Sequence, residues 1–152
     1  MLYCGDINVI CNTKKTMSKL KYEIEINRDF ENFDFKGFIE KNIECYRWVF
    51  NDINNPKNFI PPYISDVNRS RDIPTGYALS FFETKEAGSS RLKFITKNKP
   101  FLKKKLGTHI ALGNIKKTDG LCNEPNDIKH FDLFEYSGIN LIPNFTILEE
   151  II

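Results

Sequence analysis

The chain has 152 residues, of which 41% are hydrophobic and 28% are charged. These proportions are ordinary for a globular protein and exclude a wholly disordered chain, and the length suits a single domain. The formal net charge of +2 does not by itself indicate a charged partner. The four cysteines form no C-x-x-C pair, so we expect free thiols in a reducing compartment and a cytoplasmic location.

The N-terminal segment contains an apolar run that is far shorter than the ~20 residues of a membrane span. Because Met17 offers an alternative start, residues 1–16 are expected to be an extension of the domain or an added edge strand. Residues 17–152 are expected to form one soluble globular domain without membrane association.

The first half of this domain contains three periodic segments. Apolar and charged side chains alternate over residues 19–26, which predicts a half-buried strand. Residues 32–43 have N-cap candidates followed by helical apolar spacing, which predicts a short helix. The aromatic and β-branched run at residues 45–50 predicts a buried strand. Residues 51–76, rich in Asn and Pro, then form a long irregular loop, and a loop of this length is uncommon unless it lines or covers a site.

The second half contains regular elements again. A strand is predicted over residues 77–82, followed by a helix that Thr84 caps and Pro100 ends. Further strands are predicted over residues 108–115, 130–136 and 141–148. The polar connection between the first two of these contains Asp119 and Gly120, which favours their antiparallel pairing. The fold class is therefore expected to be α+β, with a mostly antiparallel or mixed sheet, about two helices and one long irregular loop.

Positive charge is concentrated between Arg91 and Lys117, a stretch with nine basic residues and no acidic one. This block indicates a surface for nucleic acid, or for the phosphates of a nucleotide. Its alternative interpretation is a solvated helix face whose charge is balanced by the acidic residues after Thr118. The candidate nucleic-acid contacts are Lys97, Lys99, Lys103, Lys104 and Lys105.

The chain has two histidines, His109 and His130, each near the start of a predicted strand. If the two strands pair, the imidazoles lie close together and act as general base and general acid in metal-independent cleavage of RNA. Asp132 would add a carboxylate to this pair, but the order of the three residues does not fit the usual metal-binding arrangement. No metal is therefore expected.

Three further residues lie on separate predicted strands. Arg47 follows Cys45-Tyr46, Ser80 ends the run Gly76-Tyr77-Ala78-Leu79-Ser80, and Glu135 lies near the end of the run from His130 to Tyr136. This order of residue types resembles that of the ADP-ribosyltransferases of the Arg–Ser–Glu type, over roughly residues 45–136.

The resemblance implies NAD as the cofactor and a role for each of these residues. Arg47 would bind the diphosphate of NAD, Ser80 would shape the nicotinamide pocket, and Glu135 would stabilise the positive charge that develops as nicotinamide leaves. The long loop would cover the dinucleotide with Arg69 and Arg71, and Tyr77 would help to bind it. A binding module without chemistry, for nucleic acid or for a protein partner, is the alternative to both enzyme hypotheses.

Overall fold

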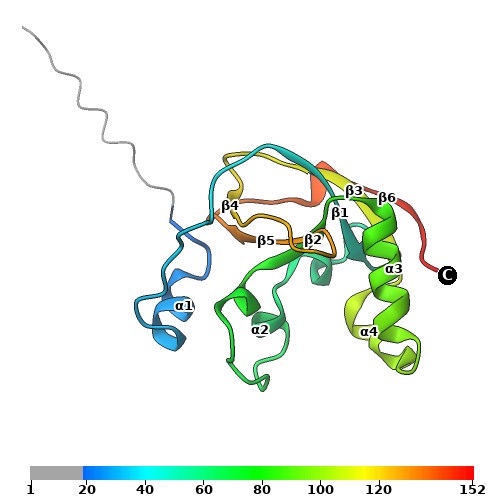
Figure 1. Cartoon of the computed structure of the whole chain (residues 1–152), viewed down its shortest axis with the longest axis horizontal. Helices are drawn as coiled ribbons and strands as arrows, with labels where there is room; N and C mark the ends of the chain where they lie inside the picture. Colours follow the sequence, from blue (N-terminus) through cyan, green and yellow to red (C-terminus); the bar gives the residue numbers. More distant parts are fainter. Residues whose placement is uncertain (1–18) are drawn as a thin grey trace, which may run out of the picture.

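The structure is a computed structural model that describes residues 19–152, and the predicted extension at residues 1–16 lies outside this range. The described part contains one six-stranded antiparallel sheet with the strand order β4-β5-β2-β1-β3-β6 (Figure 1). The strands are β1 (Ile43–Val49), β2 (Leu79–Phe82), β3 (His109–Ile115), β4 (Gly120–Cys122), β5 (His130–Glu135) and β6 (Phe145–Glu150). The helices are α1 (Glu23–Asp29), α2 (Pro62–Ser65), α3 (Lys85–Thr96) and α4 (Lys103–Leu106). This combination confirms the predicted α+β class.

The sheet has an apolar cluster on each face, because side chains alternate along each strand. On one face, Cys45, Val49 and Phe81 belong to a cluster that also contains Phe59 of the long loop and Phe145 of β6. On the other face, Leu92 of α3 packs against Ile110 of β3, together with Trp48 of β1. A third cluster, around Phe134 of β5 and Tyr77, fills the space between the sheet and α1.

The contact between β1 and β2 is unusually short. These two central strands share a single paired position, Tyr46↔Phe82, whereas β1 and β3 share seven. Past this position the guanidinium of Arg47 takes the place of ladder hydrogen bonds: its Nε donates to the carbonyl of Asn58 and its Nη1 to the carbonyl of Ser80, each at 2.7 Å. The centre of the sheet is therefore open at one end, and the long loop enters there.

The predicted strand at residues 19–26 is wrong, because this segment is a turn followed by α1. The alternation there does not correspond to burial: Ile26 is buried, but Ile24 is 71% exposed. Acidic residues in the first turn of α1 and Arg28 in its last turn match the polarity of the helix dipole.

The predicted helix at residues 32–43 is also wrong, since the segment consists of turns and an isolated bridge before β1 begins. Its phenylalanines do not form a helical stripe. Instead, Phe33, Phe35 and Phe38 each contact the ring of Phe134, with ring centroids 5.1–6.0 Å apart. Gly37 has φ +87°, a left-handed conformation that ends any helix at this point.

The predicted strands at residues 45–50, 77–82, 108–115 and 130–136 are confirmed as β1, β2, β3 and β5, with small shifts of their ends. The helix predicted up to Pro100 ends at Thr96, and the first part of the strand predicted at residues 141–148 is a 3-10 turn, Ile142–Asn144, before β6 begins. Thr84 caps α3 as predicted, because its Oγ1 accepts a hydrogen bond from the N–H of Ala87 at 3.1 Å. The strand β4 was not predicted, and the expected pairing of residues 108–115 with residues 130–136 is wrong: β3 lies between β1 and β6, and β5 lies between β2 and β4. No helix within residues 19–152 is both long and apolar enough to cross a membrane.

Candidate functional site

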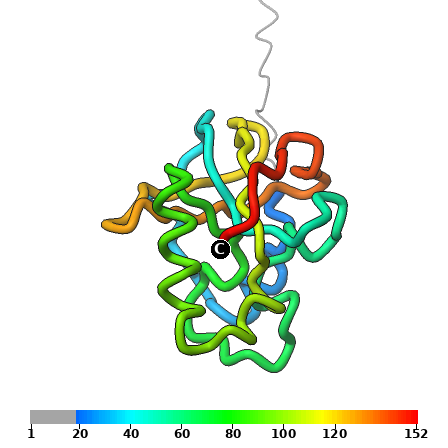
Figure 2. The backbone as a smooth tube through the Cα atoms, turned by 90° about the vertical axis from the view of Figure 1, so that its right-hand side faces the viewer, coloured from blue at the N-terminus to red at the C-terminus, as the bar shows by residue number. Residues whose placement is uncertain are grey.

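A recess with a volume of about 860 Å³ lies where β1 and β2 separate. The long loop forms one wall and the segment with α4 forms another, and both lie below the sheet in the view of Figure 1. Seen from the side, both walls reach the lower end of the molecule (Figure 2). The predicted irregular loop thus lines a site, and short elements occur within it: α2 and two 3-10 turns, Pro56–Phe59 and Pro74–Tyr77.

Arg47 lies at the inner end of this recess. Its guanidinium is enclosed by the rings of Phe59 and Phe81, whose centroids lie 5.5 and 5.4 Å from Cζ, and by the two carbonyls that accept its hydrogen bonds. Burial lowers the pKa of Arg47 to about 10, and the negative charge of Glu135 partly offsets this effect. At neutral pH the side chain is therefore a half-buried cation. Within residues 19–152 no carboxylate forms an ion pair with it.

The rest of the recess carries further positive charge. Lys57 and Arg69 lie in the wall that the long loop forms, and Lys104 and Lys105 lie in the wall with α4. Asp66 is the only acidic residue among the lining side chains of the described chain. None of the lining cations forms an ion pair within residues 19–152, so the site is suited to an anion with several negative charges.

The recess also has an aromatic wall. Trp48 and Phe50 of the β1 end and Phe82 of β2 line it, and the rings of Trp48 and Phe82 lie 5.3 Å apart. The indole is fixed in place because its Nε1 donates a hydrogen bond to the carbonyl of Gly88 in α3 at 2.7 Å. A flat heterocycle can stack on such a fixed surface while its phosphates face the cations.

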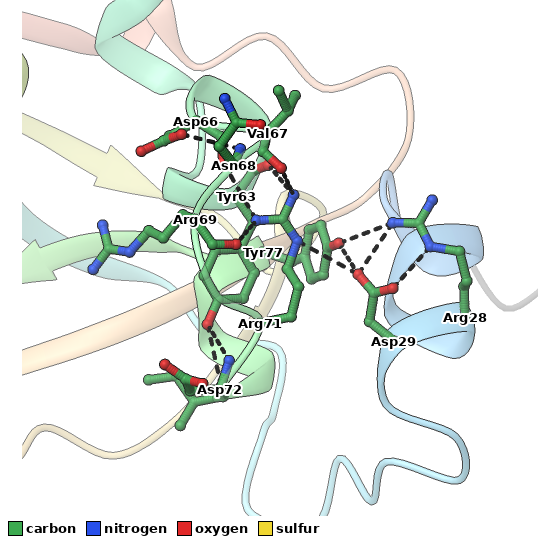
Figure 3. Close-up of polar contacts among 11 residues, drawn as sticks. Arg28, Asp29, Tyr63, Asp66, Val67, Asn68, Arg69, Arg71, Asp72 and Tyr77 are labelled. Atoms are coloured by element: carbon green, nitrogen blue, oxygen red, sulfur yellow. Dashed lines mark hydrogen bonds and ion pairs between the residues drawn. The ribbon is translucent and has the colours of Figure 1, made fainter.

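A second cluster of polar contacts holds the loop wall in shape (Figure 3). Arg71 donates hydrogen bonds to four backbone carbonyls of the loop, and its Cζ lies 4.6 Å from the ring centroid of Tyr63. The hydroxyl of Tyr63 in turn accepts hydrogen bonds from the N–H groups of Asp72 and Ile73. Arg71 therefore orders the loop rather than facing the recess, in contrast to Arg69, which lines it.

Tyr77 belongs to this second cluster and not to the lining of the recess. Its hydroxyl donates a hydrogen bond to the carboxylate of Asp29, which also forms ion pairs with Arg28 and Arg71 (Figure 3). The hydrogen bonds from Arg28 and Tyr77 lower the pKa of Asp29 to about 2. Tyr77 thus connects α1 to the loop, and its predicted contact with a dinucleotide would require the loop to rearrange.

The two other residues of the Arg–Ser–Glu resemblance lie in different surroundings. Ser80 lines the recess beside Arg47. Glu135 is only 4% exposed and lies outside the lining, with its Oε2 3.7 Å from Nζ of Lys21. Its Oε1 has no hydrogen-bond partner within the described chain. Burial raises the pKa of Glu135, whereas the charges of Lys21 and Arg47 act in the opposite direction.

The structure does not bring the two histidines together. His109 begins β3 and His130 begins β5, and the strands β1 and β2 lie between them. Three strand spacings correspond to about 14 Å, and the register of the strands places His130 level with Leu112, three residues after His109 in β3. The two imidazoles therefore do not form the pair on which the ribonuclease hypothesis depends. His109 instead lies 2.8 Å from Oγ1 of Thr108, and His130 lies 3.8 Å from Asp132.

The described part of the chain contains no group of three or more His, Cys, Asp or Glu side chains that could hold a metal ion. Cys45 and Cys122 are free and buried, and burial raises the pKa of both thiols, so neither is an activated nucleophile.

Sequence reasoning missed several residues that line the recess. Trp48 and Phe82 have the appearance of core residues in a strand, and no local pattern distinguishes a ring that faces a cavity. Lys57 and Asp66 lie in the long loop, whose composition did indicate the region but not the individual side chains. Comparison of the chain with family models, with curated proteins and with solved structures finds no match.

Proposed function

We propose that this chain binds NAD in the recess between β1 and β2 and acts as an ADP-ribosyltransferase. The observation that carries this proposal is the environment of Arg47. A half-buried guanidinium without a carboxylate partner is costly in a folded protein. A diphosphate offers two negative charges with the geometry that the free N–H groups of an arginine bind best.

The donor capacity of Arg47 supports this assignment. A guanidinium has five N–H donors, and the contacts within residues 19–152 use Nε and one hydrogen of Nη1. Three donors are therefore left for a ligand. Because the two bonds to Asn58 and Ser80 fix the plane of the group, little side-chain entropy is lost when an anion binds.

The other features of the recess fit the remaining parts of a dinucleotide. Its volume of about 860 Å³ lies within the usual range for ligand pockets. Lys57 and Lys104 extend the positive charge on both sides of Arg47, and Trp48 and Phe82 provide a surface for a flat ring. Bound NAD would supply a ribose whose bond to nicotinamide is already activated by the positive charge of the pyridinium.

Transfer requires a carboxylate near this ribose, because positive charge develops on it as nicotinamide leaves. The resemblance gives this role to Glu135, but Glu135 lies outside the recess. Asp66 is the carboxylate in the wall, and we assign the role to it. Glu135 then acts at a distance, by stabilising the protonated form of Arg47.

The test is the release of nicotinamide from NAD, with or without an added acceptor. We expect release by the wild type, a loss of at least tenfold in Asp66→Asn with NAD binding retained, and release retained in Glu135→Gln. Loss in Glu135→Gln with activity retained in Asp66→Asn would return the role to Glu135. A wild-type protein that releases no nicotinamide would overturn the proposed function.

A further inference from the structure

We propose that the acceptor of the transferred ADP-ribose is single-stranded nucleic acid, which binds along a lysine ridge and enters the recess from it. The ridge consists of Lys97, Lys99, Lys103, Lys104 and Lys105, between the end of α3 and the end of α4. The transfer step rests on the proposed function, whereas binding of the strand does not.

The charge of the ridge is not neutralised by its surroundings. None of its five lysines forms an ion pair within residues 19–152. The acidic residues of the C-terminal part that form ion pairs with lysines do so elsewhere: Glu149 with Lys85, Glu124 with Lys41 and Glu135 with Lys21. Within residues 19–152, the acidic residues after Thr118 therefore form no ion pair with the ridge.

The ridge is continuous with the recess. Lys104 and Lys105 belong to both, because they are exposed on α4 and also line the wall of the recess. Lys57 and Arg69 are exposed on the opposite wall. A row of cations thus leads from the outer surface to Arg47. Such a row fits a chain of phosphates better than it fits a single small anion.

The aromatic residues of the ridge favour a single strand over a duplex. Phe101 lies between Lys99 and Lys103 in the sequence and is 60% exposed. Phe94 on α3 is 71% exposed, and Cζ of Arg91 lies 5.3 Å from its ring centroid. Unpaired bases can stack on rings of this kind next to positive charge, whereas the bases of a duplex are already stacked on each other.

The transfer step is balanced without a further reactant. A nucleophilic oxygen or nitrogen of the strand forms a bond to C1′ of the nicotinamide ribose as the bond from C1′ to the pyridinium nitrogen breaks. The electrons of the broken bond stay with nicotinamide, which leaves as a neutral molecule. A proton on the nucleophile, where there is one, passes to solvent.

Binding is tested first, without NAD, by fluorescence anisotropy of a labelled 12-nucleotide RNA and of the DNA with the same sequence, each at several salt concentrations. Five lysine–phosphate contacts predict a log–log slope of about −3.5, which is roughly a 100-fold loss of affinity for a fourfold increase in salt. Either RNA or DNA that binds in this way supports the proposal, and the comparison identifies the natural strand. Binding of neither, or equally tight binding of a duplex, overturns it.

Variants then locate the surface. Replacing Lys103, Lys104 and Lys105 by Gln should reduce the slope to about −1.4, because only two of the five contacts are left. Phe101→Ala should weaken binding severalfold without a change in slope, since stacking releases no counterions. The control is the double variant Lys116→Gln with Lys117→Gln, at two lysines of the same basic block that follow β3. It should change neither the affinity nor the salt slope. Losses as large in the control as in the triple variant would contradict the proposal.

The acceptor role is tested with NAD that is labelled in the adenylate part. Label on the oligonucleotide supports the proposal. Release of nicotinamide with label only on protein overturns the acceptor while the proposed function stands. Label only on free ADP-ribose overturns both, because NAD has then been hydrolysed by water and no group has been transferred. Salt-sensitive binding of the strand without any release of nicotinamide overturns the proposed function, and with it the acceptor role, but leaves the ridge as a binding surface.

Discussion

Replacement of Arg47 by Met separates a structural from a functional explanation of this half-buried cation. Exchanging a buried charge for an apolar side chain of similar volume removes a desolvation penalty and often stabilises a protein by about 1–4 kcal/mol. The same exchange leaves the carbonyls of Asn58 and Ser80 without a donor, at about 1–3 kcal/mol each if they stay dry. Ser80 is half-buried in the wall of the recess, so its cost lies at the low end, whereas Asn58 is only 2% exposed and its cost lies at the high end.

The two contributions therefore nearly cancel. We expect the free energy of unfolding of Arg47→Met to lie within about 1.5 kcal/mol of the wild type. Urea unfolding, followed by the fluorescence of the single tryptophan Trp48, measures it. Arg71→Met is the control, with an expected loss of about 2 kcal/mol, because Arg71 holds four loop carbonyls. A loss above about 3 kcal/mol in Arg47→Met would refute the reasoning and make Arg47 a structural residue.

Three further predictions concern the fold. Burial raises the pKa of Glu135 above its value in the unfolded chain, so the free energy of unfolding should fall as the pH rises from about 4.5 through the folded-state pKa. Urea unfolding at pH 4–8 should show this fall in the wild type and a smaller fall in Glu135→Gln. Gly76→Ala should lower the midpoint of thermal unfolding, since the added methyl would overlap the ring of Tyr63, at a cost of about 1–3 kcal/mol. Thr84→Ala should cost about 1 kcal/mol in urea unfolding, because the N–H of Ala87 loses its cap.

An element could be predicted from the sequence where its local pattern of apolar residues agrees with their burial. The strand around Arg47 and the helix after Thr84 were predicted because their apolar residues do face the core and the cap is formed. The strand predicted at residues 19–26 was wrong because Tyr22 and Ile24 are not buried, although they alternate with charged residues. Alternation alone does not show which side chains are buried. The aromatic cluster around Phe134 depends on a long-range contact that no local pattern encodes.

The candidate site was predictable only in part for the same reason. Arg47 and Ser80 meet because β1 and β2 are neighbours, and the long loop was recognised by its composition. Whether a strand residue faces a cavity or the core depends on how far β1 and β2 separate, which the sequence does not encode locally. The position of Glu135 outside the recess, and that of Asp66 in its wall, follow from the tertiary fold alone.

The most direct test of NAD binding in the recess is a calorimetric titration of NAD into the wild type, Arg47→Met and Arg91→Met. Arg91 lies outside the recess and serves as the matched control. Loss of charge-assisted bonds worth about 1.5–3 kcal/mol predicts roughly 10- to 150-fold weaker binding in Arg47→Met, with the control unchanged. Equal affinity of Arg47→Met and the wild type, or no binding of NAD to the wild type at millimolar concentration, would contradict the account.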